Sequence, residues 1–247
     1  MLLNTRMSTT PTNEKRWYQF LSLSLLLGLA AAIAALIFFG WLTDEVLEGD
    51  SRHFDEVTRT AVHQLASPLL TAIMRFLSFV GSTIVLTIGT IVIVVVFLVR
   101  KWSREAKLFA ATMIGAAILN VTLKMTFKRA RPTPFFDLTP PETYSFPSGH
   151  SLGSACFFGA LAALFTARIR DRRIRVLVWI LCTTMFLLIG LSRIYLGVHH
   201  TTDVIAGFVA ALIWILMVRF VEMELARRRK RKVGQDLQDL NRINKIN

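Results

Sequence analysis

The sequence contains few of the residues from which disulfide frameworks and metal centres are built. Its 247 residues include only 2 cysteines and 16 acidic residues. Cys156 and Cys182 both lie within apolar runs and lack metal-ligand spacing, so we expect two buried small hydrophobic side chains rather than a disulfide or a metal site. The chain also shows no internal repeat and no composition break that would mark a second domain.

Charged residues are scarce as well, at 18% of the chain, whereas hydrophobic residues make up 53%. This composition is typical of an integral membrane protein and argues against a soluble domain. The net charge of +13 would suggest nucleic acid as the partner of a soluble protein. Here the basic residues gather in short loops and near the end of the chain, which indicates membrane orientation instead and no nucleic-acid partner.

About six segments are long and apolar enough to cross a bilayer, which takes roughly 20 residues as a helix. They are residues 18–42, 82–100, 107–127, 149–168, 175–194 and 201–221. We therefore predict an all-α fold, an integral membrane bundle of about six transmembrane helices over residues 18–222. Residues 1–17 are expected to form a cytoplasmic leader, and residues 223–247 a basic, flexible cytoplasmic tail.

Two weaker segments lie between the first and second predicted spans. From Arg52 to Leu65, apolar residues recur at helical spacing, which favours an amphipathic helix at the membrane interface. The segment opened by Ser67-Pro68 is too short to cross the membrane, and it is either a second interfacial helix that covers the site or a simple connector. The sequence thus indicates one or two interfacial helices, with residues 52–81 as a candidate lid.

The orientation in the membrane follows from lysine and arginine in the short loops. With six spans, four basic groups fall on one side, at residues 15–16, 100–107, 168–175 and 227–232. The positive-inside rule places that side in the cytoplasm, as for a multi-pass protein of the plasma (inner) membrane with both termini inside. Lys128, Arg129 and Arg131 run against this bias, which is tolerable if Arg131 serves catalysis.

Three polar clusters stand at the extracytoplasmic ends of the predicted spans. In the last of them, Arg193 precedes His199, and Asp203 follows His199 by four residues and so shares its helical face. A carboxylate there can hold one ring nitrogen of His199 and leave the other free and nucleophilic. A capping histidine beside an unrelated aspartate is the alternative, which the nearby Arg193 disfavours.

The other two clusters contain groups that bind anions. Ser148 can cap the fourth predicted span, and the free N–H groups of that first turn form a site for an anion. Gly149 allows close approach of the backbone, and His150 can protonate a leaving oxygen. Lys124 and Arg131 offer a point charge and a planar fork for phosphate oxygens. Either cluster alone is a weak indication, because helix starts and basic loops commonly look like this.

In combination the clusters resemble the type 2 phosphatidic acid phosphatase superfamily. Its three motifs are Lys-x6-Arg-Pro, Pro-Ser-Gly-His and Ser-Arg-x5-His-x3-Asp. They occur here in order and with unbroken spacing, from Lys124 to Pro132, from Pro147 to His150 and from Ser192 to Asp203. Within the superfamily the resemblance is to phosphatidylglycerophosphatase B-like and undecaprenyl-diphosphate phosphatase-like membrane enzymes.

The resemblance implies a metal-independent lipid phosphatase without a cofactor. His199 would form a phosphohistidine, Asp203 would orient it, and His150 would protonate the departing lipid oxygen and then activate water. Five residues would bind the phosphate: Lys124, Arg131, Ser148, Gly149 and Arg193. The partners implied are the membrane and a lipid substrate, which would be phosphatidylglycerol phosphate, phosphatidic acid or undecaprenyl diphosphate.

Three alternatives remain beside this interpretation. A lipid-to-lipid phosphotransferase would have the same motifs and differ only in acceptor access. A lipid-binding or transport protein with an inactive site is disfavoured by the intact His199, His150 and Asp203. A vanadate-binding haloperoxidase of the same superfamily is disfavoured by the predicted spans, since those enzymes are soluble.

Overall fold

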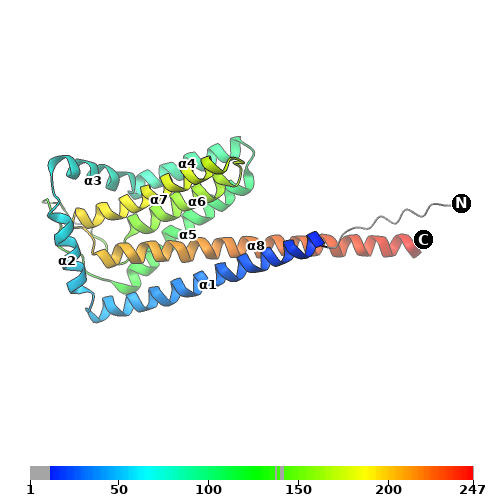
Figure 1. Cartoon of the computed structure of the whole chain (residues 1–247), viewed down its shortest axis with the longest axis horizontal. Helices are drawn as coiled ribbons and strands as arrows, with labels where there is room; N and C mark the ends of the chain where they lie inside the picture. The colour runs from blue at the N-terminus through cyan, green and yellow to red at the C-terminus, as the bar shows by residue number, and fades with distance from the viewer. Residues whose placement is uncertain (1–11, 137, 140–141, 247) are drawn as a thin grey trace.

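The computed structural model describes residues 12–136, 138–139 and 142–246, and their regular structure is entirely α-helical (Figure 1). The helices are α1 (Thr12–Glu48), α2 (Arg52–His63), α3 (Pro68–Val80), α4 (Thr83–Val99), α5 (Ser103–Phe127), α6 (Gly149–Thr166), α7 (Arg172–Tyr195) and α8 (Thr201–Ile246). Of the predicted leader, residues 1–11 lie outside the described part, and residues 12–17 open α1.

Short polar side chains cap several of the helices. The Ser67 hydroxyl accepts from the Leu70 N–H at 3.3 Å, with Pro68 as the first residue of α3. The Asp171 carboxylate accepts from the Arg173 N–H at 2.7 Å at the start of α7. These contacts satisfy N–H groups that have no partner inside the helix, and they explain why the helices begin where they do.

The all-helical membrane fold and its span count are confirmed. Five helices are long and apolar enough to cross a bilayer, namely α1, α5, α6, α7 and α8. The second predicted span, residues 82–100, corresponds to α4, which has only 17 residues. It meets the same test together with α3, from which it is bent by 53° at the break after Val80.

Both terminal helices are longer than the sequence indicates. The first predicted span lies inside the 37 residues of α1, and the last lies inside the 46 residues of α8. The segment expected to be a flexible tail continues α8 as far as Ile246. Its composition explains the difference, because it is rich in arginine, lysine, leucine and glutamine, which are good helix formers, and contains no proline.

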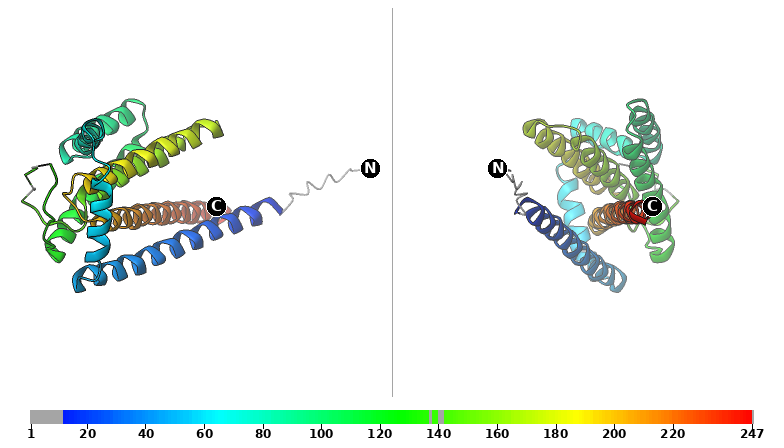
Figure 2. Two further views of the ribbon diagram at one scale, coloured as in Figure 1. Left: turned by 60° about the vertical axis from the view of Figure 1, so that its left-hand side comes forward. Right: turned by 90° about the vertical axis from the view of Figure 1, so that its right-hand side faces the viewer.

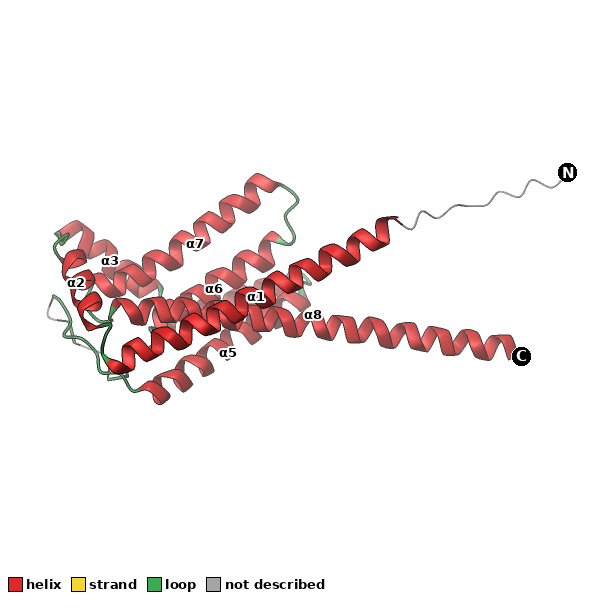
Figure 3. Cartoon of the chain, turned by 60° about the horizontal axis from the view of Figure 1, so that its bottom comes forward, coloured by secondary structure: helices red, strands yellow, loops and turns green. Residues whose placement is uncertain are grey.

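The two ends of the bundle differ in character. At one end, α2 lies across the other helices beside the long connection from α5 to α6 and the short one from α7 to α8 (Figures 1 and 2). The basic α4–α5 and α6–α7 connections lie at the opposite end (Figure 1). The helices α1 and α8 separate towards the ends of the chain (Figure 3). The three polar clusters therefore gather at the end that carries α2.

The core is built around α6, which contacts α4, α5, α7 and α8. Interlocking aromatic rings of α4, α5 and α6 fill the half of the bundle away from the clusters, with Phe109 of α5 in edge contact with Phe97 and Phe157. Cys156 of α6 is buried, as expected, but Cys182 is only partly buried. The expectation for Cys182 was wrong because α7 lies at the edge of the bundle and buries few of its side chains.

Candidate functional site

The third cluster is formed where a tight turn joins α7 to α8. Gly197 in this turn has φ +72°, and a Cβ there would lie 2.7 Å from the Phe135 backbone nitrogen. Only glycine meets both demands without strain. The Phe135 N–H donates to the Leu196 carbonyl at 3.1 Å, which ties the turn to the α5–α6 connection. His199 is thereby placed just before the first turn of α8.

The structure brings His199 and Asp203 together in the buried interior. The His199 Nδ1 atom lies 3.3 Å from Asp203 Oδ2, and the side chains are 2% and 0% exposed. On the other side of the ring, Arg131 Nη1 lies 3.0 Å from His199 Nε2. Because a guanidinium can only donate, Nε2 must carry its lone pair and Nδ1 its proton. The nitrogen that faces away from Asp203 is therefore the one that carries the lone pair.

Burial lowers the pKa of His199 to about 3, although the neighbouring carboxylate of Asp203 acts in the opposite direction. The nearby guanidinium groups of Arg131 and Arg193 lower the pKa further. The imidazole is therefore neutral near pH 7, which is the state that a nitrogen nucleophile requires.

Arg131 is held by the backbone on both sides of the site. Its Nε donates to the Thr143 carbonyl at 2.7 Å, and its Nη1 donates to the Val198 carbonyl at 2.9 Å. Burial lowers the pKa of Arg131, but an arginine remains charged. Its planar fork thus points at the position that a phosphoryl group on His199 would take.

The other two predicted cations come from different helices. Lys124, at the end of α5, donates to the Tyr144 carbonyl and, at 3.4 Å, to the Ser145 carbonyl. Arg193, at the end of α7, is 7% exposed and donates through Nη1 to the Ser78 hydroxyl of α3, while its Nε has no partner. Three positive charges thus converge on one site, and the unpartnered Nε is a donor that an anion can use.

The second cluster begins α6, as predicted. The Ser148 hydroxyl accepts from the Ser151 N–H at 3.4 Å, and the Ser148 N–H donates to the Asp203 carbonyl at 2.9 Å. The backbone of α8 therefore uses the Ser148 N–H, and phosphate binding at Ser148 stays a prediction. Gly149, which begins the helix, remains the candidate backbone donor of this turn.

The starts of α6 and α8 touch backbone to backbone. A Cβ at Gly207 would lie 2.7 Å from the Ser148 carbonyl oxygen and 2.8 Å from the Ser151 Cβ, so no larger residue fits without a shift. This close approach sets the distance between the helix that begins beside His199 and the helix that carries His150.

The segment between α2 and α4 forms part of the site. The His150 ring lies beside Gly81 at the end of α3, where a Cβ would be 3.3 Å from its Cδ2 atom, and the Ser78 hydroxyl of α3 accepts from Arg193. The Tyr195 hydroxyl lies 2.7 Å from that of Thr71 on α3. Of the two alternatives for this segment, a covering helix and a simple connector, the structure favours the first, because α3 contacts two of the predicted site residues.

Three further residues of the site were missed by sequence reasoning. Ser145 donates to Asp203 Oδ2, beside His199 Nδ1 at 3.5 Å. Arg129 bonds Asp203 Oδ1 at 2.6 Å and Asp55 of α2 at 2.8 Å. The one available indication was that Arg129 opposes the charge bias of its side of the membrane.

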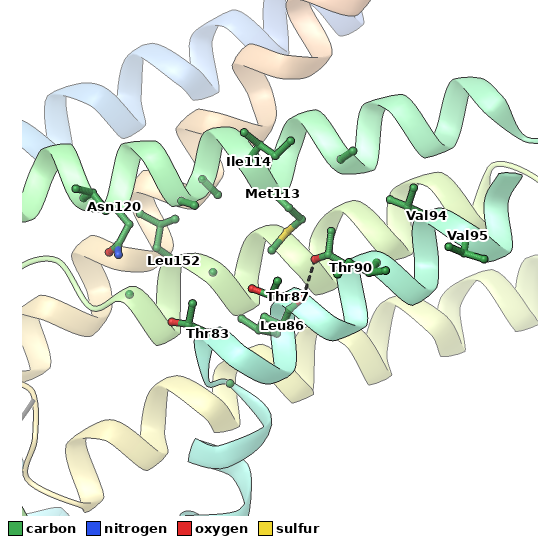
Figure 4. A pocket seen from close by; sticks show the side chains of 18 residues that line it. Thr83, Leu86, Thr87, Thr90, Val94, Val95, Met113, Ile114, Asn120 and Leu152 are labelled. Atoms are coloured by element: carbon green, nitrogen blue, oxygen red, sulfur yellow. Dashed lines mark hydrogen bonds between the residues drawn. The ribbon is translucent and has the colours of Figure 1, made fainter.

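An apolar cavity of about 640 Å³ reaches the site from the flank of the bundle (Figure 4). It lies between α4 and α5 with α6 behind it, and it is lined mainly by aliphatic side chains such as Val94 and Ile114. Gly149 and Asn120 line it where it meets the second cluster, and the Asn120 Oδ1 atom is buried without a partner. The cavity runs from the start of α6 to the flank of the bundle between α4 and α5.

Comparison with known proteins agrees with the motifs and with the fold. Residues 105–225 match the PAP2 superfamily. Phosphatidylglycerophosphatase B of Bacillus subtilis is 28% identical over 202 residues, which are 81% of this chain and 98% of the relative. Undecaprenyl-diphosphatase of Sulfolobus acidocaldarius is 32% identical over 145 residues, 56% of this chain and 64% of the relative.

A solved structure supports the same assignment. The crystal structure of the first transmembrane PAP2 type phosphatidylglycerolphosphate phosphatase from Bacillus subtilis aligns with a TM-score of 0.72 and 27% identity. The alignment covers 78% of this chain and 96% of that structure.

Proposed function

Because this chain carries a PAP2 superfamily domain and is a lipid phosphatase of that family, we propose that it acts through a phosphohistidine on His199. The observation that carries the proposal is the geometry of His199, with Asp203 on Nδ1 and an unprotonated Nε2 that faces a guanidinium. The resemblance that motivates the family assignment is confirmed, and the steps below rest on these contacts.

In the first step the Nε2 lone pair attacks phosphorus, and the bond from phosphorus to the lipid oxygen breaks. The incoming phosphate replaces Nε2 as the partner of Arg131, which then binds a phosphoryl oxygen together with Lys124 and Arg193. Protonated His150 gives its proton to the departing lipid oxygen and becomes neutral. Charge placed in advance around the transferred group is the main catalytic contribution in reactions of this kind.

In the second step water attacks the phosphohistidine. Neutral His150 takes the proton of the water, the P–N bond breaks, and inorganic phosphate leaves. Asp203 stabilises the positive charge that the His199 ring carries in the intermediate, because it accepts the hydrogen bond from Nδ1. The cycle ends with both histidines in their starting states, and we propose that it requires no metal ion.

The substrate is a lipid that carries a phosphate monoester or a diphosphate. We propose phosphatidylglycerol phosphate, phosphatidic acid or undecaprenyl diphosphate, and the names of the relatives support the first and the third of these. The apolar cavity between α4 and α5 supports sideways access from the membrane, with the lipid chains in the cavity and the phosphate at Gly149.

The protein is a multi-pass membrane protein, and we propose that its site faces the extracytoplasmic side of the plasma (inner) membrane with both termini in the cytoplasm. The support is the separation of charge along the bundle. The basic connections of α4–α5 and α6–α7 lie at the end opposite the site, and such loops stay in the cytoplasm.

The test is phosphate release by purified protein in detergent with excess chelator. The three lipids are compared, with His199→Ala as the inactive variant and His53→Ala as the control, since His53 lies exposed on α2. We expect turnover that survives the chelator and is lost only in His199→Ala. Folded wild-type protein that releases no phosphate from any lipid would contradict hydrolysis, and appearance of the phosphate on a second lipid would identify a phosphotransferase.

A further inference from the structure

One arginine outside the family motifs bridges the catalytic carboxylate to a helix at the membrane surface. Arg129 Nη1 donates to Asp203 Oδ1 at 2.6 Å, and Arg129 Nη2 donates to Asp55 Oδ2 at 2.8 Å. Asp55 lies in the first turn of α2 and is 1% exposed in its side chain, while Arg129 is 13% exposed. Two buried carboxylates from distant parts of the chain therefore share one guanidinium.

Thr202 closes this network into a ring of contacts. Its N–H donates to Asp55 Oδ1 at 2.9 Å, and its hydroxyl donates to Asp55 Oδ2 at 2.8 Å. Arg129 Nη1 also lies 2.8 Å from the Thr202 hydroxyl oxygen. Both oxygens of Asp55 thus accept from Thr202, the residue that precedes Asp203, and Oδ2 also accepts from Arg129. Asp55 cannot move without releasing Arg129 or the start of α8.

This network of contacts determines which oxygen of Asp203 faces His199. Oδ2 receives the His199 Nδ1, the Ser145 hydroxyl and, at 2.9 Å, the His200 N–H. Arg129 holds Oδ1 on the opposite side, so the carboxylate cannot rotate. Asp55 also balances the charge of Arg129. Without that balance the guanidinium would compete with the positively charged ring of phosphorylated His199 for Asp203.

We propose that Asp55 and Arg129 are positioning residues for the proposed phosphotransfer, acting on His199 through Asp203. This inference rests on the proposed function. It gives α2 a role at the reacting centre, although neither Asp55 nor Arg129 touches the substrate. Both should affect the rate of phosphohistidine formation while leaving the phosphate-binding cations Lys124, Arg131 and Arg193 in place.

Asp55 could instead have a purely structural role, as an anchor of the α5–α6 connection. The contacts of α2 allow this role to be distinguished from the positioning of Asp203. The α2 helix has a second tie to the α5–α6 connection, since Arg59 Nη2 donates to the Thr133 carbonyl at 2.8 Å. This tie remains when Asp55 is changed. If Asp55 merely anchored the connection, its loss would shift Arg131 and weaken phosphate binding. If it positions Asp203, phosphate binding stays intact.

The experiment compares Asp55→Asn, Arg129→Gln and the double variant with wild type. Asparagine keeps the size of Asp55, but it has one acceptor oxygen in place of two, so it cannot accept from both the Thr202 N–H and the Arg129 guanidinium. The measurements are kcat and KM on whichever of the three proposed lipids wild type hydrolyses fastest, and the inhibition constant of inorganic phosphate. Glu56→Gln is the matched control, because this side chain of α2 is 62% exposed and bonds only Arg59 among the described residues.

We expect each single variant to lose about a hundredfold in kcat, the loss that follows from a misplacement of about 1 Å at a reacting group. The phosphate inhibition constant stays at its wild-type value, and the double variant is no slower than the slower single variant, because the two residues act in one chain. Unchanged kcat, additive losses, or an inhibition constant that rises as kcat falls would each overturn the proposal.

A second variant covers failure to fold. If Asp55→Asn gives no folded protein, Arg129→Lys decides, since an ammonium is a single point of charge and cannot fork between two carboxylates. It is expected to show the same loss of kcat at unchanged phosphate inhibition, and wild-type kcat would overturn the proposal. Turnover by wild type and by Glu56→Gln separates this question from the proposed function, which fails only if they too release no phosphate.

Discussion

At the scale of single residues, the neutral state of His199 links catalysis to stability. The pKa of His199 is about 3 in the folded protein, below the ordinary value of 6.5, because the ring is buried. Between these values the unfolded chain binds a proton that the folded chain does not bind, so stability falls as the pH falls through this window. The full effect of one such group is about 1.4 kcal/mol for each pH unit.

This predicts a difference between wild type and His199→Gln in thermal unfolding. The melting temperature of wild type in detergent should fall more steeply from pH 6.5 towards pH 4 than that of the variant, in which this group is absent. Titrating groups that do not contact His199 contribute equally to both proteins and cancel in the comparison. Parallel curves would show that His199 is not held neutral by burial.

Single residues also show which contacts of the site could be predicted from the sequence. The four-residue spacing of His199 and Asp203 was sufficient to place them together, because a helix imposes that neighbourhood. The other partners of Asp203 could not be predicted from the sequence. Asp55 lies 148 residues before Asp203, and Arg129 is one of several basic residues in its loop. Which of these side chains meets the carboxylate depends on how α2 lies across the bundle.

At the scale of elements, the contact of α6 with α8 governs how the two histidines face each other. We predict that Gly207→Ala destabilises the protein by about 1–3 kcal/mol, as other overpacked sites do. A shift of either helix also separates His150 from His199, so the rate of phosphate release should fall. Thermal unfolding and the lipid assay measure the two effects on one preparation.

Gly40→Ala is the control for this prediction. No atom lies within 4 Å of a Cβ at Gly40 in α1, and alanine in a helix is favoured over glycine by roughly 0.5–1 kcal/mol. It should leave activity unchanged and raise the melting temperature slightly. A Gly207→Ala protein that behaves like Gly40→Ala would mean that the close approach of the helices is not needed.

The elements themselves were predicted to different extents. Apolar length was sufficient to find the six spans, because a bilayer imposes it directly. The ends of α1 and α8 were not found, since helix propensity continues where apolar character stops. The bend of 53° between α3 and α4 was not found either, because a break in a helix depends on what each half packs against.

At the scale of the whole molecule, the charge difference between the two ends predicts a direction in the membrane. In a chain without Cys156 and Cys182, single cysteines are placed at Thr139, exposed near the site, and at Arg170, exposed in the α6–α7 connection. An impermeant maleimide added to intact cells should label the first and not the second. Permeabilised cells should label both, and the reverse pattern in intact cells would place the site in the cytoplasm.

The contact between Arg131 and the His199 Nε2 atom has a consequence for chemoselectivity. In the resting protein a guanidinium N–H caps the lone pair that attacks in the proposed mechanism. A neutral electrophile, such as an alkylating reagent, cannot draw Arg131 away from His199, so the Nε2 lone pair stays hydrogen-bonded and unavailable to it. An anion draws Arg131 onto its own oxygens and uncovers the nitrogen as it arrives. The site thus discriminates between electrophiles by their charge before their shape is tested.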